Sequence, residues 1–302
     1  MTNKSNVNIF SLMIKSILLS ILGIIFPVFY IFIPVIFIVE SVFSGIVKIF
    51  SAFLGICLIL GLILSPQIGI MFLILFGPFI LIFHYMISNK YSVESTIMVT
   101  AVVFFLSLLV SFYWVGFTPE SINSPESIEN FIEFQKAALN SAGDSMGISE
   151  VELTQIYNMT VQMIPSAVII MSLVLAYLTY TMASRSIAKR GGSIVQPFKF
   201  SFFKIPKGLP LALLLSMVLI YFFKGTLGDY SSVLIRNLVV VFGFILFVLG
   251  FSVVVFWVNK MKLGSILKFL IYVSVFLVPG FQLVLIVLGV LDYIFNFRKL
   301  LN

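Results

Sequence analysis

Long runs of apolar residues recur along almost the whole chain, and they constrain its fold more than any other feature. A helix needs roughly 20 apolar residues to cross the hydrocarbon core of a bilayer. Only 10% of the residues are charged, whereas about 25% is usual for a soluble domain. The chain has too little polar surface to enclose a water-soluble core. It therefore predicts an all-α, polytopic transmembrane helical bundle.

Prolines, glycines and short polar groups divide the apolar runs into spans. Pro27 splits the first run into a tight hairpin. The predicted spans cover about 8–25, 28–45, 49–64, 68–87, 95–115, 162–184, 209–223 and 232–258. The last run, about 265–291, carries Pro279-Gly280 at its centre, and it forms either one long tilted helix or two short helices.

Residues 117–160 are polar and predict two short amphipathic helices. Ser124 and Pro125 have the residue types of an N-cap and a first helical position. Ser149 and Glu152 have the spacing of a capping box. We expect the second of these helices to run toward the sixth span.

The charges are divided sharply between two loops. Residues 117–160 hold seven acids and one base, whereas 185–207 hold six bases and no acid. The positive-inside rule places the basic loop and the N-terminus in the cytoplasm and the acidic loop outside. A basic C-terminus on the cytoplasmic side favours a turn at Pro279-Gly280 and about ten spans, and nine spans are the alternative. The domains expected are 1–184, a cytoplasmic basic loop 185–208, and a C-terminal membrane unit 209–302.

Charged groups inside predicted spans mark candidate sites, since they are costly in the membrane. Lys15 and Glu40 lie at similar distances from Pro27, so we hypothesise an ion pair between them; both could instead extend to the cytoplasmic interface. Near the outer end of the eighth span, Arg236 and Asn237 could contact an anionic solute, or Arg236 could pair with Asp229.

Further polar residues lie near the C-terminus and on the first span. Asp292 could pair with Arg298 or Lys299 in the terminal segment that also contains Phe297. Ser16, Ser20 and Gly23 form a small-residue stripe. It serves either as an internal packing face or as a docking face for a membrane-protein partner.

Composition excludes several function classes. One cysteine and one histidine leave no disulfide, cysteine metal cluster or paired-histidine site, and no nucleotide-binding or hydrolase motif occurs. We therefore predict no enzyme activity, cofactor or metal. The net charge of +7 follows from topology, so no nucleic-acid partner is expected. The aromatic residues among the lysines of 185–207 favour an anchor on anionic headgroups, or a docking site for a partner.

Several short motifs together resemble one family. They are Pro27 with Pro34, Ile164-Pro165, Pro197-Phe198, Arg236-Asn237-Leu238, Gly250-Phe251-Ser252 and the C-terminal Asp292-Tyr293-Ile294-Phe295-Asn296-Phe297-Arg298-Lys299. The chain resembles the YybS-like family of Gram-positive bacterial membrane proteins, a domain of unknown function, although Asn296 replaces an expected acid. The resemblance implies a bacterial cell membrane.

The resemblance extends distantly to the substrate-binding subunits of energy-coupling-factor transporters, which have six spans and an external cap. It implies a solute-binding or transport-related protein with a polar cavity beneath the acidic loop. The alternative is a structural or regulatory scaffold in envelope growth or sporulation.

Overall fold

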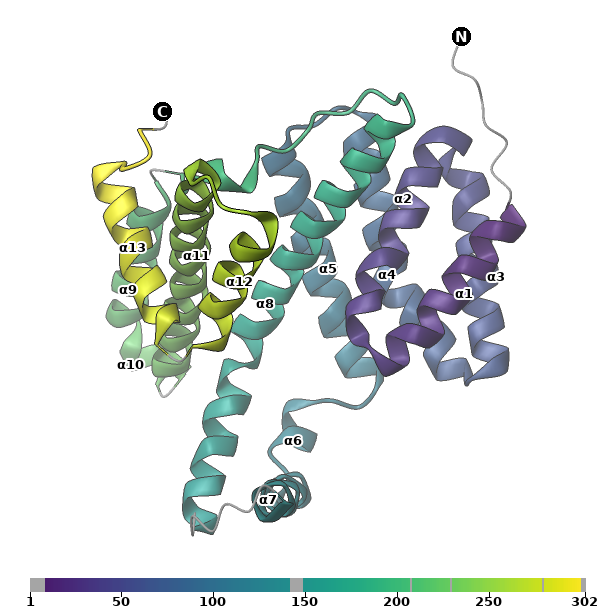
Figure 1. Ribbon diagram of the computed structural model, residues 1–302. Helices are drawn as coiled ribbons and strands as arrows, with labels where there is room; N and C mark the ends of the chain where they lie inside the picture. The colour runs from purple at the N-terminus through teal and green to yellow at the C-terminus, as the bar shows by residue number, and fades with distance from the viewer. Residues whose placement is uncertain (1–8, 142–148, 207, 229, 279, 300–302) are drawn as a thin grey trace. The chain divides into compact units, whose positions relative to one another are not determined.

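The computed structural model describes residues 9–141, 149–206, 208–228, 230–278 and 280–299, and every regular element among them is helical (Figure 1). The all-α prediction is confirmed for these residues. The elements are α1 (Ile9–Ile25), η1 (Pro27–Ile31), α2 (Phe32–Ser44), α3 (Ile46–Ile63), α4 (Pro66–Ser88), α5 (Val93–Trp114), α6 (Pro119–Ile122), α7 (Pro125–Ser141), α8 (Glu150–Lys189), η2 (Phe200–Phe202), α9 (Leu209–Phe222), α10 (Lys224–Leu227), α11 (Tyr230–Lys260), α12 (Ser265–Leu277) and α13 (Phe281–Phe295).

The helix ends lie where turn and capping residues interrupt the apolar runs. Pro27 begins the 3-10 turn that separates α1 from α2. Gly45 separates α2 from α3 with a φ of 85°, a value that a glycine adopts without steric cost. The hydroxyls of Ser65 and Ser92 accept backbone N–H bonds at the starts of α4 and α5. Local chemistry therefore sets the boundaries of the apolar helices.

The chain forms two compact units. The first contains the described residues up to Val161 and Met171–Pro197, and the second contains Gln162–Ile170 and the described residues from Phe198 onward. The sequence placed the first domain boundary at residue 184, whereas the first unit continues to Pro197. Helix α8 contributes residues to both units.

The first unit has an aromatic core formed by α2, α3, α4 and α5. Phe37, Phe53 and Phe79 are at most 1% exposed. Phe37 packs edge-on against Phe53, and Phe79 packs edge-on against Phe104. Helix α4 comes very close to α3, because a Cβ at Gly69 would lie 2.4 Å from the carbonyl oxygen of Cys57. Glycine is required at this contact.

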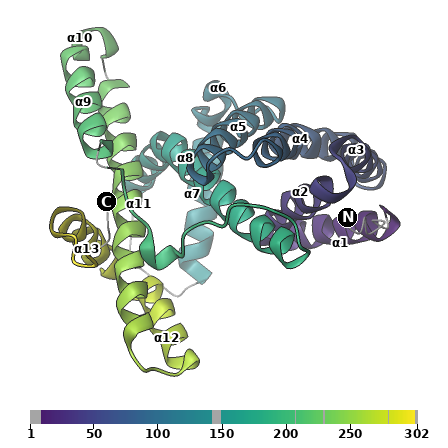
Figure 2. The same cartoon turned by 90° about the horizontal axis from the view of Figure 1, so that it is seen from above.

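In the second unit, α13 lies beside α11 (Figures 1 and 2). Leu246 and Leu249 of α11 are buried with Ile205. A Cβ at Gly250 would lie 1.9 Å from the carbonyl oxygen of Leu285, and one at Gly289 would lie 2.2 Å from that of Leu246. The two backbones therefore touch at this crossing.

Six helical segments are long and apolar enough to cross a membrane, and there are up to seven if the bent α12–α13 pair counts as one span. The structure thus describes a multi-pass helical bundle but does not reproduce about ten spans. The difference arises because α1 and α9 have only 17 and 14 residues. A helix of 14 residues is about 21 Å long, shorter than the hydrocarbon core of about 30 Å.

The last apolar run breaks into two helices, one of the two forms expected for it. Helices α12 and α13 have 13 and 15 residues and are bent by 104° relative to each other. Gly280 lies in the left-handed region at the start of α13. Each helix is too short to cross a bilayer alone, so the pair has the form of a broken span or a re-entrant hairpin.

The acidic segment differs from its prediction in two respects, and one of them is the additional short helix α6. Helix α7 begins at Pro125, and Ser124 accepts the N–H of Ser127 as expected. The second amphipathic helix is not separate but is continuous with the sixth span as α8, which has 40 residues. A helix of this length is about 60 Å long, so its acidic start extends beyond a hydrocarbon core of about 30 Å.

Candidate functional site

Asn237 of α11 binds the backbone of α8 next to a proline. Its Oδ1 accepts the N–H of Ser166 at 2.8 Å, and its Nδ2 donates to the carbonyl of Gln162 at 2.7 Å. In a regular α-helix the N–H of Ser166 would donate to the carbonyl of Gln162, so Asn237 binds both members of one i→i−4 pair. Pro165 has no N–H, so one helical hydrogen bond is absent here, and its ring crowds the preceding turn. The Asn237 amide therefore bridges a weakened turn of α8.

Asn237 is itself fully satisfied. Its second Nδ2 hydrogen goes to the carbonyl of Val233 at 2.8 Å, and the residue is 9% exposed. A buried primary amide with all its groups bonded can fix the register of two helices. Asn237 thus couples α11 to the Gln162–Ile170 segment of the second unit.

Arg236 lies beside this bridge and is only partly buried. Its Nη1 donates to Oε1 of Gln162 at 2.9 Å. No carboxylate of the described residues forms an ion pair with it. The predicted partner Asp229 lies outside the described residues. Arg236 therefore places a guanidinium, which has five N–H donors, next to a neutral amide.

Arg298 forms the most buried charged cluster in the described part of the chain. Its Nε and Nη2 donate to Oδ2 of Asp292 at 3.1 and 2.8 Å. Asn296, in the left-handed region with a φ of 48°, turns the chain so that Arg298 returns toward α13. The structure thus joins Asp292 to Arg298, one of the two partners considered from the sequence.

The rest of the Arg298 guanidinium binds the segment around η2 and α11. It donates to the carbonyls of Ser201 and Phe203, both at 2.8 Å, and to the hydroxyl of Ser252 at 2.9 Å. The side chain is 1% exposed. No donor in the described residues reaches Oδ1 of Asp292. The cluster fixes the basic-aromatic segment onto the C-terminal helices.

The predicted pair of Lys15 and Glu40 is not formed. Glu40 instead makes a two-pronged ion pair with Arg190, at 2.8 and 3.2 Å. The Arg190 guanidinium also lies 4.3 Å from the centre of the Phe43 ring. Lys15 is exposed and no acid of the described residues pairs with it. Equal spacing from Pro27 therefore did not identify the partner of Glu40.

The small-residue stripe of α1 is buried inside the first unit. Ser16 and Ser20 are 0% and 1% exposed, and their hydroxyls bond to carbonyls one turn back, those of Leu12 and Ser16. A Cβ at Gly23 would lie 2.3 Å from the ring of Tyr30. The stripe is therefore an internal packing face, and the structure leaves it no exposed surface for a partner.

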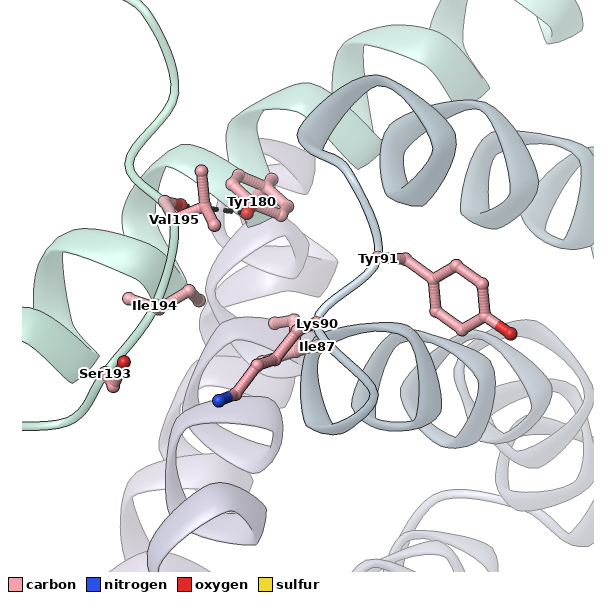
Figure 3. Close-up of a pocket in the computed structure, with 7 residues that line it drawn as sticks. All are labelled: Ile87, Lys90, Tyr91, Tyr180, Ser193, Ile194 and Val195. Atoms are coloured by element: carbon pink, nitrogen blue, oxygen red, sulfur yellow. Dashed lines mark hydrogen bonds between the residues drawn. The ribbon is translucent and has the colours of Figure 1, made fainter.

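A small cavity in the first unit lies between the end of α4 and the segment after α8 (Figure 3). Lys90, Tyr91, Tyr180 and Val195 are among its lining residues, and its volume is about 50 Å³. The Tyr180 hydroxyl donates to the carbonyl of Val195 at 2.9 Å across it, while the Tyr91 ring points away. The space suits a few water molecules. The bond between Tyr180 and Val195 connects α8 with the segment that follows it.

The acidic segment is held by local hydrogen bonds. The capping box predicted at Ser149 and Glu152 is present. Bonds from the N–H and hydroxyl of Ser149 lower the pKa of Glu152, and the bond and charge of Lys136 lower the pKa of Glu150. The Tyr157 hydroxyl donates to the carbonyl of Ile122. These contacts connect α8 with α6 and α7.

Sequence reasoning missed Gln162, Arg190, Ser201 and Ser252 as site residues. Each binds a residue that lies at least 46 positions away along the chain. Arg190 and Ser201 lie in the loop recognised as basic, but no local pattern names their partners. Two of them carried a signal: Gln162 lies three residues from a proline inside an apolar run, and Ser252 belongs to the motif Gly250-Phe251-Ser252.

Together these features define a polytopic helical membrane protein whose helices are joined by a few buried polar clusters. Residues 9–293 match the family described as "Predicted membrane protein (DUF2232)". The chain belongs to this family of predicted membrane proteins. Comparison with curated proteins and with solved structures gives no match.

Proposed function

We propose that this protein binds a small anionic solute at Arg236 and serves in its uptake or transport, without catalysis. The observation that carries the proposal is a partly buried guanidinium, in an otherwise apolar helix, whose described partner is a neutral amide. Charged side chains in spanning helices usually mark binding sites or ion pathways. Among the described residues Gln162 takes one N–H of Arg236, and the other N–H groups suit a carboxylate or a phosphate.

The proline-containing turn of α8 supports this proposal. Transporters commonly bind their solutes where a proline or glycine weakens or breaks a spanning helix. Helix α8 is continuous, but Pro165 and the two Asn237 bonds lie within one turn of the Gln162 that binds Arg236.

Neither of the two cavities described in the structure lies at Arg236. The proposal therefore requires α8 and α11 to separate locally when a solute enters. When the Asn237 side chain withdraws, the N–H of Ser166 can donate to the carbonyl of Gln162 instead. Both backbone groups then remain paired, which would permit the separation.

The test is thermal unfolding of the purified protein with a panel of small carboxylates and phosphates. A solute that binds the folded state at 100 times its Kd stabilises it by about 2.7 kcal/mol. Arg236→Gln should abolish this stabilisation, whereas Arg185→Gln, which removes an exposed arginine elsewhere, should retain it. The proposal would be contradicted if each anion stabilised Arg236→Gln as much as Arg185→Gln.

A second candidate function is a membrane scaffold, favoured by the buried Arg298 cluster. This cluster fixes the segment 199–204 beside Phe198, which is 78% exposed. A fixed basic-aromatic segment suits the binding of a partner or of the membrane surface. Crosslinking from position 198 in cells tests this candidate: recovery of one defined partner supports it, and recovery of lipid alone contradicts it.

A further inference from the structure

The crossing of α11 and α13 determines the space between them. At Gly250 and Gly289 the two backbones are in contact. Straight helices that touch at one point diverge on either side of it. Toward the C-terminal ends of α11 and α13 the side chains do not fill the widening space, and an apolar groove results.

This groove has a volume of about 380 Å³ and is open along one side. Its walls include Val253, Val254, Trp257 and Val258 of α11, and Leu288 and Phe297. Trp257 and Phe297 are 45% and 48% exposed. Its volume lies in the range of small-molecule binding sites. The wall residues named here are all apolar, so they suit a hydrocarbon chain.

Basic residues neighbour, along the chain, two of the residues that line the groove. Met261, which also lines it, lies between Lys260 and Lys262, and Phe297 is followed by Arg298 and Lys299. The Lys260 ammonium lies 4.3 Å from the centre of the Phe256 ring and 5.0 Å from that of Trp257. These aromatic rings hold a positive charge at the groove's end while its outer side faces water.

Acidic residues are almost absent from this unit. Asp292 is the one carboxylate in the described part of this unit, and it is already paired with Arg298. Among the described residues, no acid therefore competes for the lysines at the groove. A ligand that offers both an apolar chain and a negative charge matches this distribution.

We propose that the groove between α11 and α13 binds one phospholipid with an anionic headgroup. An acyl chain occupies the groove beside Val254 and Leu288, and the phosphate lies near Lys260 and Lys262. Basic pockets between spanning helices bind such headgroups, and tryptophan prefers the headgroup level of a bilayer. A second copy of the chain fits less well, because its own lysine-rich end would lie against these lysines.

The test is native mass spectrometry of the full chain in detergent micelles. Dioleoyl phosphatidylglycerol and dioleoyl phosphatidylcholine are added in parallel, so the probes differ only in the headgroup. We expect one tightly retained phosphatidylglycerol, bound at least tenfold more strongly than phosphatidylcholine, since each lysine near the headgroup adds affinity. Equal retention of the two lipids, or a dimer without lipid, overturns the proposal.

Two variants locate the lipid. In the double variant Lys260→Gln, Lys262→Gln, the preference for phosphatidylglycerol over phosphatidylcholine should fall by roughly tenfold or more. The matched control Lys48→Gln, Lys90→Gln removes two basic residues from the other unit and should keep it. If both double variants lost the preference, the preference would depend on net charge alone, and the proposed lipid site in the groove would be overturned.

A third variant tests the chain-binding part of the groove. Val254→Phe fills the space beside Leu288 and should displace the lipid while the lysines remain. Val239→Phe adds the same volume at a 51% exposed position of the same helix and should retain it. Both proteins must show wild-type thermal unfolding without lipid. Full retention of lipid by a folded Val254→Phe protein overturns the proposal.

Discussion

Asp292 and Arg298 form an ion pair with an N–O distance of 2.8 Å, and both side chains are at most 5% exposed. Removal of one member leaves the other charge buried and unpaired. Asp292→Asn and Arg298→Gln should each reduce the free energy of unfolding by about 3–5 kcal/mol. Denaturant unfolding in detergent micelles measures this, and the double variant should lose much less than the sum. Additive losses would show that the two charges are not coupled.

Asn237 should tolerate an apolar replacement better than a charged one. Asn237→Leu removes both bonds to α8, but Ser166 and Gln162 can then pair with each other, so we expect a loss of about 1 kcal/mol. Asn237→Asp keeps the acceptor, loses the donor and places a carboxylate against the Gln162 carbonyl. Its loss should be roughly 1–3 kcal/mol or more. Thermal unfolding of the two variants decides the order, and the reverse order would contradict the bridging role.

The pair of Glu40 and Arg190 should survive an exchange of its members. Glu40→Gln should cost about 1 kcal/mol, because the pair is two-pronged but partly exposed. The swapped double variant Glu40→Arg, Arg190→Glu should recover part of this loss. Lys15→Gln should leave the unfolding temperature unchanged. An effect of Lys15→Gln as large as that of Glu40→Gln would restore the pair suggested by the sequence.

The start of α8 should loosen in acid. The folded-state pKa of Glu152 lies below its ordinary value of 4.5, so its contribution to stability is present above that pH. It is lost as the pH falls through the lowered folded value. Hydrogen exchange of the first turn of α8, corrected for intrinsic rates, should show protection constant from pH 7 to 5 and decreasing below about 4.5.

The control for this pH dependence is Glu152→Gln. Glutamine can still accept the N–H of Ser149 in a capping box but does not titrate. Its protection should not change through the same pH range. Identical pH profiles for the variant and the wild type would assign the acid effect to another group.

Labelling of single cysteines checks the topology. In a Cys57→Ser background, an impermeant maleimide should reach Glu133→Cys and Lys204→Cys from opposite sides of the membrane. If α12 and α13 form a re-entrant hairpin, Leu263→Cys and Lys299→Cys should label from the same side as Lys204→Cys. Labelling of positions 263 and 299 from opposite sides would indicate a single broken span.

The helices were largely predictable from the sequence because each depends on local information. Apolar runs marked the spans, Pro27 marked the first turn, and Ser149 with Glu152 marked the start of α8. The number of crossings was not predictable in this way. Apolarity indicates that α1, α9, α12 and α13 prefer apolar surroundings, but only their lengths decide whether they can cross a bilayer.

The polar contacts were predictable only where sequence neighbours meet. Asp292 and Arg298 are six residues apart, and the sequence suggested their contact. Glu40 and Arg190 are 150 residues apart. Matching depth along two helices suggested Lys15 for Glu40, but depth does not determine the direction in which a side chain projects. That direction depends on how all the helices pack together.

The participation of α8 in both units affects how the protein can be divided for experiments. Gln162 and Ser166, which hold Asn237, precede the basic loop in the chain, whereas Asn237 itself follows it. A chain cut within the basic loop would give a C-terminal fragment that lacks part of its own interior. The two fragments should therefore accumulate only when they are produced together in the same cell.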